Sequence, residues 1–179
     1  MTRFETVRAE LAALLTSSLA MPFARQLAAE SLGTDCPHPT PVVLIHGLFG
    51  SATNFHALRR SLEARGVARF ASFTYGPRID YQVLAPELGE FIGRLCERSG
   101  EAQVDIVGHS LGGTVARWLI EHGDGGRIRR LVTLGAPWYG GRFPARELAL
   151  FGEADWLIPA PAAEHVRGQV RIVPGSGHL

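Results

Sequence analysis

The sequence predicts an α/β fold, in which about six mostly parallel strands form a sheet that helices cover on both faces. From residue 42 onward, short apolar runs alternate with longer amphipathic segments, which is the pattern of successive strand–helix–strand units. The first run, Val42-Val43-Leu44-Ile45, is continuous and mostly β-branched, as is typical of a strand buried on both faces. The length of 179 residues falls within the ~100–200 residues of a single domain.

The elements follow in order along the chain. Each predicted strand is a short run rich in apolar residues, and each predicted helix has apolar residues at helical spacing, such as Leu84, Leu88 and Ile92. The predicted strands are residues 42–45, 69–75, 104–107 and 128–134, with weaker ones at 148–151 and 170–173. The predicted helices are residues 52–65, 84–97 and 111–121. Because ligands of a parallel sheet bind at the carboxyl ends of its strands, the loops after these strands are where we expect the site.

The first 40 residues form a distinct predicted segment. Apolar residues at helical spacing predict soluble helices over residues 4–19 and 22–32, and the turn formers of residues 33–41 predict a linker. We therefore divide the chain into a helical segment with its linker, residues 1–40, and a compact α/β domain, residues 41–179. The apolar stretch at residues 11–23 is too short to span a bilayer, and no clean signal-peptide cleavage site follows it. The compartment stays open, with the cytoplasm favoured over secretion.

Composition excludes several function classes. The chain has 18 Lys+Arg against 17 Asp+Glu, without the basic excess of a nucleic-acid binder. Two cysteines, Cys36 and Cys96, are too few for a disulfide scaffold or a four-cysteine zinc site, and we expect free thiols. No metal-ligand spacing is present, and no G-x-G-x-x-G dinucleotide signature opens a helix, so no cofactor is expected. The oligomeric state is left open.

The strongest motif is Gly108-His109-Ser110-Leu111-Gly112, which fits G-x-S-x-G. It follows the predicted strand at 104–107 and opens the predicted helix at 111–121, which is the context that supports such a motif. Glycines are needed on either side because a Cβ would crowd the neighbouring strand and helix, and the serine backbone itself is strained. Ser110 is therefore the expected nucleophile, presented in a cleft where the helix N-terminus faces developing negative charge.

A second glycine-rich turn, His46-Gly47-Leu48-Phe49-Gly50, follows the first predicted strand. Such a turn aims a backbone N–H at the carbonyl oxygen of a substrate. We expect the amides of Leu48 and Leu111 to form an oxyanion hole, in which the loss of one donor costs ~10²–10³ in rate. His46 is expected to be a structural turn residue and not a catalytic one.

At these two motifs, and at Leu131-Val132-Thr133-Leu134-Gly135-Ala136-Pro137, the chain resembles the α/β-hydrolase superfamily, most closely the small lidless bacterial lipases and esterases. The resemblance covers roughly residues 41–179 and implies a three-layer α/β-hydrolase fold. It also implies a catalytic triad in the order Ser, Asp or Glu, His along the chain.

The acid and the base of this triad follow from the resemblance. Asp155, in the loop after residues 148–151, is similar to the family's acid, and Glu153 in the same loop is its rival. His178, in a glycine-rich loop after residues 170–173, is the expected base. The alternative, His165, comes before that strand and therefore does not face the carboxyl edge.

The implied activity is that of a serine carboxylic ester hydrolase, which acts through an acyl-enzyme on short to medium acyl esters. Its expected partner is a small-molecule ester or lipid. A thioesterase or an acyltransferase would use the same triad, and both stay open as alternatives. The non-enzymatic alternative is a catalytically silent hydrolase fold kept as a binding module.

Two departures from the larger lipases affect the expected site. Only residues 138–154 separate Pro137 from Asp155, which leaves no room for a cap domain. The chain also ends one residue after His178, where relatives add a covering helix, so the N-terminal helices are expected to cover that face instead. Truncation of the chain after His178 is the competing explanation and stays open. Candidate acyl contacts at the mouth are aromatic or aliphatic: Phe49, Phe55, Trp138, Tyr139, Trp156 and Ile158.

Overall fold

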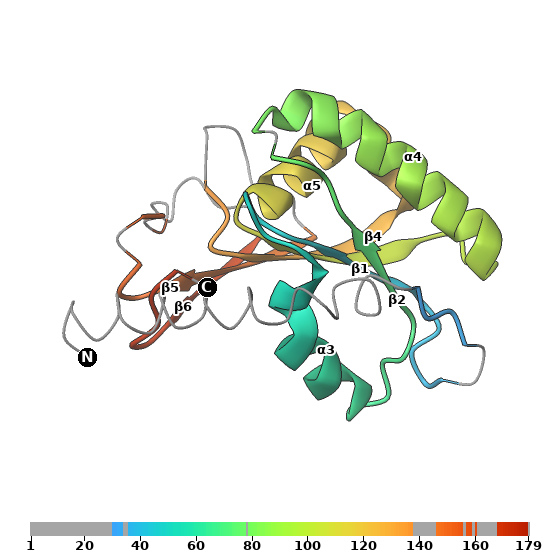
Figure 1. Ribbon diagram of the computed structural model, residues 1–179, viewed down its shortest axis with the longest axis horizontal. Coiled ribbons are helices and arrows are strands. Elements are labelled where there is room, and N and C mark those ends of the chain that lie inside the picture. Colours follow the sequence, from blue (N-terminus) through green and yellow to red (C-terminus); the bar gives the residue numbers. More distant parts are fainter. Residues whose placement is uncertain are drawn as a thin grey trace.

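The computed structural model describes residues 30–33, 36–77, 79–137, 146–155, 157–158, 160 and 168–178. Within these residues, helices and strands alternate (Figure 1). The order is β1 (Val42–Ile45), η2 (Ala52–Phe55), α3 (His56–Glu63), β2 (Phe70–Phe73), α4 (Tyr81–Ser99), β3 (Val104–His109), α5 (Leu111–His122), η3 (Gly125–Arg127), β4 (Ile128–Leu134), β5 (Glu147–Gly152) and β6 (Gln169–Val173). Every strand predicted from the sequence is confirmed, whereas the helix predicted at residues 52–65 is divided into a 3₁₀ turn and α3.

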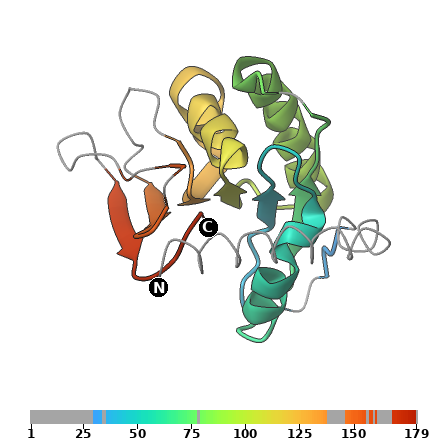
Figure 2. The same cartoon turned by 60° about the vertical axis from the view of Figure 1, so that its left-hand side comes forward.

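The six strands of the described residues form one sheet in the order β2-β1-β3-β4-β5-β6, and each neighbouring pair is parallel. The predicted parallel α/β fold is therefore confirmed. In the register, Ile45 lies opposite Gly108, and His109 lies opposite Leu134. The carboxyl ends of the central strands β1, β3 and β4 consequently meet at one edge. Figure 2 shows β5 and β6, drawn in orange and red, at the end of the sheet away from α3.

Strand β1 is apolar throughout because both of its faces are covered. Val43 and Ile45 face α4 and α5 in the largest buried cluster, whereas Val42 and Leu44 belong to a second cluster that includes side chains of α3. In Figure 1, α4 and α5 lie on one side of the sheet and α3 lies on the other. The molecule thus has three layers, as a doubly covered parallel sheet requires.

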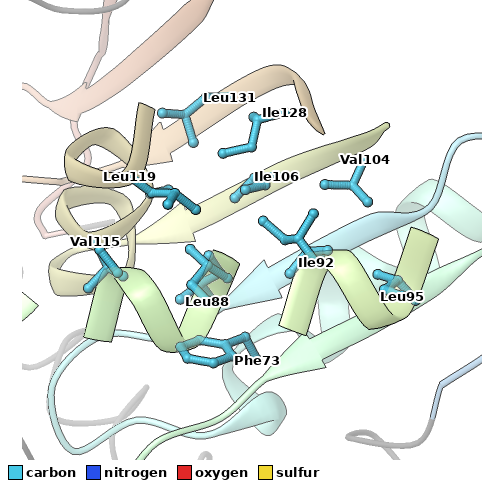
Figure 3. Packing of buried hydrophobic residues seen from close by; sticks show 14 of the residues in the cluster. Phe73, Leu88, Ile92, Leu95, Val104, Ile106, Val115, Leu119, Ile128 and Leu131 are labelled. Carbon is cyan, nitrogen blue, oxygen red and sulfur yellow. The ribbon is translucent and has the colours of Figure 1, made fainter. Parts of the chain in front are cut away.

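The larger cluster fixes α5, the helix that begins at the serine motif. Leu88 and Ile92 of α4 pack with Val115 and Leu119 of α5 against the side chains of β3 and β4 (Figure 3). Burial of one such side chain stabilises the fold by about 1.5–3 kcal/mol. Helix α4 itself has clear end signals, because Asp80 accepts hydrogen bonds from the first-turn amides and the following Gly100 adopts φ 73°.

The helix predicted over residues 22–32 is wrong at its end. Ser31 forms an antiparallel bridge with Phe70, and the backbone N–H and carbonyl of each residue are paired with the other at 2.9 Å. The reason is that β2 is an edge strand with unpaired peptide groups, which Ser31 satisfies. The expected helices before residue 30 lie outside the described residues.

The predicted linker is attached to the domain beside it. The His38 imidazole bonds Asp105 of β3 at 3.1 Å, and Arg69 donates to the Pro39 carbonyl at 2.6 Å. Arg129 of β4 forms a bidentate pair with the same Asp105, at 2.9 and 2.6 Å. These contacts join the segment before β1 to the amino ends of β3 and β4.

Cys36 and Cys96 are not in a disulfide, which confirms the expected free thiols. No helix in the described part of the chain is long and apolar enough to cross a membrane. Within the same residues, His, Cys, Asp and Glu side chains form no group of three or more that is arranged to hold a metal ion.

Candidate active site

Ser110 lies at a sharp turn between β3 and α5. Its backbone has φ 49° and ψ −121°, a conformation that non-glycine residues rarely adopt. Its amide donates to the Leu134 carbonyl at 2.8 Å, so the turn is bonded to the end of β4. Leu111 follows as the first residue of α5, and its N–H is one of the helix-terminal amides that have no acceptor within the helix.

The glycines around Ser110 are required by close packing. A Cβ on Gly108 would lie 2.7 Å from backbone atoms of Gly113, and a Cβ on Gly112 would lie 2.4 Å from the Ile45 carbonyl oxygen. The steric argument made from the motif is therefore confirmed. The atoms that a new Cβ would meet belong to the backbone, which cannot move away as a flexible side chain can. The short Gly112–Ile45 distance also shows that β1 lies directly against the start of α5.

The turn at residues 47–50 lies against Ser110. A Cβ on Gly47 would lie 3.0 Å from the Ser110 Cβ and 2.9 Å from Nδ1 of His109. The Gly50 amide donates to the Gly47 carbonyl at 3.0 Å and closes the turn, with Leu48 and Phe49 at its two central positions. Gly47 and Ser110 are therefore in contact. Leu48 directly follows Gly47, and Leu111 directly follows Ser110.

His178 and Asp155 form a close pair. Oδ2 of Asp155 lies 2.9 Å from Nδ1 of His178, and Oδ1 accepts from the amides of Leu157 and Ile158 at 3.0 and 2.8 Å. The Asp155 side chain is fully buried, and that of His178 is 18% exposed. Because a carboxylate only accepts, Nδ1 carries the proton and Nε2 is the basic nitrogen of His178.

Three contacts bring this pair beside the serine turn. The rings of His178 and His109 are 5.1 Å apart between centroids. A Cβ on Gly135 would lie 3.0 Å from the His178 ring and 3.5 Å from Oδ2 of Asp155. Gly135 directly follows Leu134, whose carbonyl holds the Ser110 amide. Side chains from the ends of β3, β5 and β6 are therefore gathered at one edge of the sheet.

Glu153, the rival acid, has a different contact. It is exposed, and its Oε2 accepts from the Gly175 amide at 2.9 Å. This bond holds the loop that leads to His178, whereas the imidazole of His178 is bonded to the Asp155 carboxylate. The alternative base, His165, lies outside the described residues.

His46 is a packed residue, in agreement with its predicted structural role. It is 3% exposed, and its ring stacks on that of Tyr75 with centroids 4.4 Å apart. Nδ1 bonds the Gly47 carbonyl at 2.8 Å, and Nε2 accepts from the Tyr75 amide at 3.3 Å. Burial lowers the pKa of His46, although the bond to Gly47 acts in the opposite direction, so the ring is neutral near pH 7.

The candidate acyl contacts differ in their surroundings. Phe49 is 84% exposed, and Ile158 is partly buried against Ala149 and Phe151. The prediction that Phe55 contacts the acyl chain is corrected, because its side chain is 3% exposed and packs in the core cluster that contains Val42 and Leu44 of β1. Trp138, Tyr139 and Trp156 lie outside the described residues.

A buried ion pair anchors the helix that follows Ser110. Arg117 of α5 binds Glu147 of β5 through two bonds of 3.0 and 2.6 Å, and Thr133 donates to the same carboxylate at 2.7 Å. Arg117 also donates to the Pro137 carbonyl at 2.9 Å. Since Arg117 and Glu147 are 6% and 2% exposed, the pair connects α5, β4 and β5 inside the protein.

Sequence reasoning missed two residues that shape this region. Tyr75 lies at the end of the predicted strand at residues 69–75, and no motif indicates that its ring stacks on His46. For Glu153 the sequence suggests only the role of an alternative acid, whereas in the structure its carboxylate holds the Gly175 loop. Its position two residues before Asp155 in a short loop was the available signal.

A family model described as the alpha/beta hydrolase fold matches residues 40–157, more than half of the chain. Among curated proteins, the chain is similar to the sn-1-specific diacylglycerol lipase ABHD11 of Danio rerio, with 33% identity over 85 residues. That alignment covers 43% of this chain but 26% of the lipase. The chain therefore spans about a quarter of that relative's length.

Solved structures show the same fold. Est1E from Butyrivibrio proteoclasticus superposes with a TM-score of 0.64 at 17% identity, covering 83% of this chain and 84% of Est1E. The mature lipase BlEst2 of Bacillus licheniformis has a TM-score of 0.50 at 27% identity, covering 57% of this chain and 44% of the lipase.

Proposed function

Because the chain belongs to the α/β-hydrolase fold family, we propose that it is a serine carboxylic ester hydrolase with Ser110, Asp155 and His178 as its catalytic triad. The observation that supports this most is the 2.9 Å contact between His178 and Asp155 beside the strained Ser110 turn. In this proposal Ser110 is the nucleophile, His178 the base and Asp155 the group that orients the imidazole. The amides of Leu48 and Leu111 are the oxyanion donors.

The proposed reaction follows from these roles. Nε2 of His178 takes the Ser110 proton as Oγ attacks the ester carbonyl, and the two amides stabilise the resulting oxyanion. The same nitrogen then protonates the leaving alcohol, which leaves an acyl group on Ser110. His178 next activates a water molecule, which releases the carboxylic acid and restores the serine. The buried Asp155 stabilises the imidazolium that forms in each step.

The proposed substrates are short to medium acyl esters. The exposed Phe49, at a central position of the turn that lies against Ser110, supplies an apolar contact for the acyl chain. The name of the Danio rerio relative makes a lipid ester a reasonable member of the substrate panel. A transferase or thioesterase activity would rest on the same groups, so the panel also needs an acyl-CoA.

The test is a series of nitrophenyl esters from acetate to palmitate, measured beside an acyl-CoA of matched chain length. We expect hydrolysis of the shorter esters, and a loss on the order of 10⁴-fold or more in Ser110→Ala and in His178→Ala. Glu153→Gln is the matched control for Asp155→Asn, because both change a carboxylate of one loop to its amide. The proposal is wrong if Ser110→Ala keeps most of the ester hydrolysis. A protein that hydrolyses no ester but cleaves the acyl-CoA would be a thioesterase.

A further inference from the structure

The turn at residues 47–50 is strained at Phe49. This residue has φ 57°, a left-handed conformation that costs a non-glycine residue about 1–2 kcal/mol. Its side chain is 84% exposed, so packing of the phenyl ring does not compensate for the strain. Strained backbone of this kind persists where the surrounding structure over-determines it.

The groups on the β2 side are His46 and Tyr75, which we call the His46–Tyr75 clamp. Their rings stack with centroids 4.4 Å apart and planes inclined by 20°. The Tyr75 hydroxyl donates to the His46 carbonyl at 2.6 Å, and the Tyr75 amide approaches Nε2 of His46 at 3.3 Å. Nδ1 of His46 lies 2.8 Å from the Gly47 carbonyl.

One neutral tautomer of His46 satisfies every contact of the clamp. A carbonyl only accepts, so Nδ1–H donates to Gly47, and Nε2 is left to accept the Tyr75 N–H. Burial raises the pKa of the Tyr75 phenol, which keeps its O–H available as a donor. The two residues therefore hold the carbonyls of two successive peptide groups, His46–Gly47 and Gly47–Leu48.

On its other side, the turn is held by the residues that follow it. The Asn54 carboxamide accepts from the Ser51 amide at 2.8 Å, and the Ser51 hydroxyl accepts from the Thr53 amide at 3.3 Å. This capping box fixes the start of η2 one residue after Gly50. The strained turn therefore stands between a capping box and the His46–Tyr75 clamp.

The clamp also lies close to the proposed chemistry. A Cβ on Gly112 would be 2.6 Å from the His46 carbonyl oxygen, the atom that accepts the Tyr75 hydroxyl bond. Gly47, which accepts the His46 bond, lies against the Ser110 side chain. The Gly47 carbonyl shares its peptide group with the Leu48 N–H, so the His46 bond to this carbonyl fixes the direction of that N–H. A shift of His46 or of its carbonyl, which Tyr75 holds, would reach the Leu48 N–H through Gly47.

We propose that Tyr75 is a positioning residue, which acts through His46 to keep the Leu48 amide aimed at the oxyanion of the tetrahedral intermediate. The inference rests on the proposed function, since it assumes that Leu48 is an oxyanion donor. Its physical basis is preorganisation, because a donor fixed before the reaction loses no energy to reorientation in the transition state. Tyr75 touches neither the substrate nor the reacting atoms in this role.

The test is Tyr75→Phe, which removes the hydroxyl and keeps the ring and the backbone amide. We expect kcat to fall about tenfold, less than the ~10²–10³ that follows complete loss of an oxyanion donor, with KM nearly unchanged. Affinity for an aryl trifluoromethyl ketone, whose serine adduct carries an oxyanion, falls by the same factor as kcat/KM. Tyr81→Phe is the matched control, because it also removes a tyrosine hydroxyl, at a ring that packs on Trp118 of α5.

A second variant and a second measurement keep the test independent of folding losses. His46→Gln retains a donor and an acceptor but lacks the ring that stacks on Tyr75, and we expect the same kinetic signature. Hydrogen exchange at the Gly50 amide, which is bonded to Gly47, should be faster in Tyr75→Phe while exchange in α4 is unchanged.

The outcomes separate the two levels of the proposal. If wild-type protein is active and Tyr75→Phe keeps its kcat and its ketone affinity, the role of Tyr75 is refuted, even if the variant melts earlier. If wild-type protein neither hydrolyses esters nor binds the ketone, the proposed function itself is wrong.

Discussion

Gly152 ends β5 at the point where the loop carrying His178 crosses it. A Cβ on Gly152 would lie 1.8 Å from the Gly177 carbonyl oxygen and 2.6 Å from that of Ser176. Ordinary contacts begin at 3.4 Å, and both atoms belong to the backbone, so Gly152→Ala displaces the loop by more than 1 Å. A displacement of about 1 Å at a catalytic group costs ~10²-fold in rate, which is the loss of kcat/KM expected for ester hydrolysis.

The assay compares Gly152→Ala with Gly175→Ala by nitrophenyl ester hydrolysis and by thermal melting. Gly175 has φ 67°, and its Cβ position is empty within 4 Å, so alanine there adds backbone strain without a clash. We expect Gly175→Ala to hydrolyse esters almost as wild type does. The overpacked Gly152→Ala loses about 1–3 kcal/mol of stability, and its melting temperature falls by several degrees. The reasoning is refuted if the folded Gly152→Ala protein is as active as Gly175→Ala.

Three further predictions concern the strained turn, the buried histidine and the buried ion pair. Phe49→Gly relieves the left-handed backbone strain, so the melting temperature should stay the same or rise. Because the variant lacks the phenyl ring, kcat/KM for longer acyl esters should fall. An equal loss of kcat/KM for acetate and octanoate esters would count against an acyl contact at Phe49. Burial lowers the pKa of His46 in the folded state, so between that pKa and the unfolded-state value of about 6.5 only the unfolded chain takes up the proton. The free energy of unfolding should therefore decline as pH falls below about 6.5 and level off below the folded-state pKa. Urea titrations of His46→Gln should show a smaller decline. Arg117→Met leaves Glu147 buried without its counter-charge and should cost about 3–5 kcal/mol, a loss that Arg117→Met combined with Glu147→Leu should largely reverse.

Much of the fold was predictable because its strands have a simple physical signature. The run at β1 is apolar at every position since Val43 and Leu44 face opposite covered sides of the sheet. Strand β4 is less uniform, since Arg129 and Arg130 stand among its apolar residues, yet its bounds match the predicted residues 128–134. The end of the predicted helix at residues 22–32 failed because Ser31 pairs with Phe70, a contact between distant residues that local periodicity does not contain.

The candidate site was predictable where a motif carries its own steric reason. The glycines at 108 and 112 are explained by contacts with α5 and β1, as the motif suggested. The sequence alone does not decide between Asp155 and Glu153, because both carboxylates occupy one loop. The structure shows that Asp155 is the one bonded to His178. Tyr75 lies outside any motif, and its contact with His46 depends on the adjacency of β1 and β2.

The most direct test of the proposed triad is covalent labelling with a fluorophosphonate, followed by peptide mass spectrometry. We predict a single adduct on Ser110, which is absent in Ser110→Ala and forms several orders of magnitude more slowly in His178→Ala. An adduct on another residue, or labelling in His178→Ala at the wild-type rate, would contradict the assignment of Ser110 and His178 as nucleophile and base.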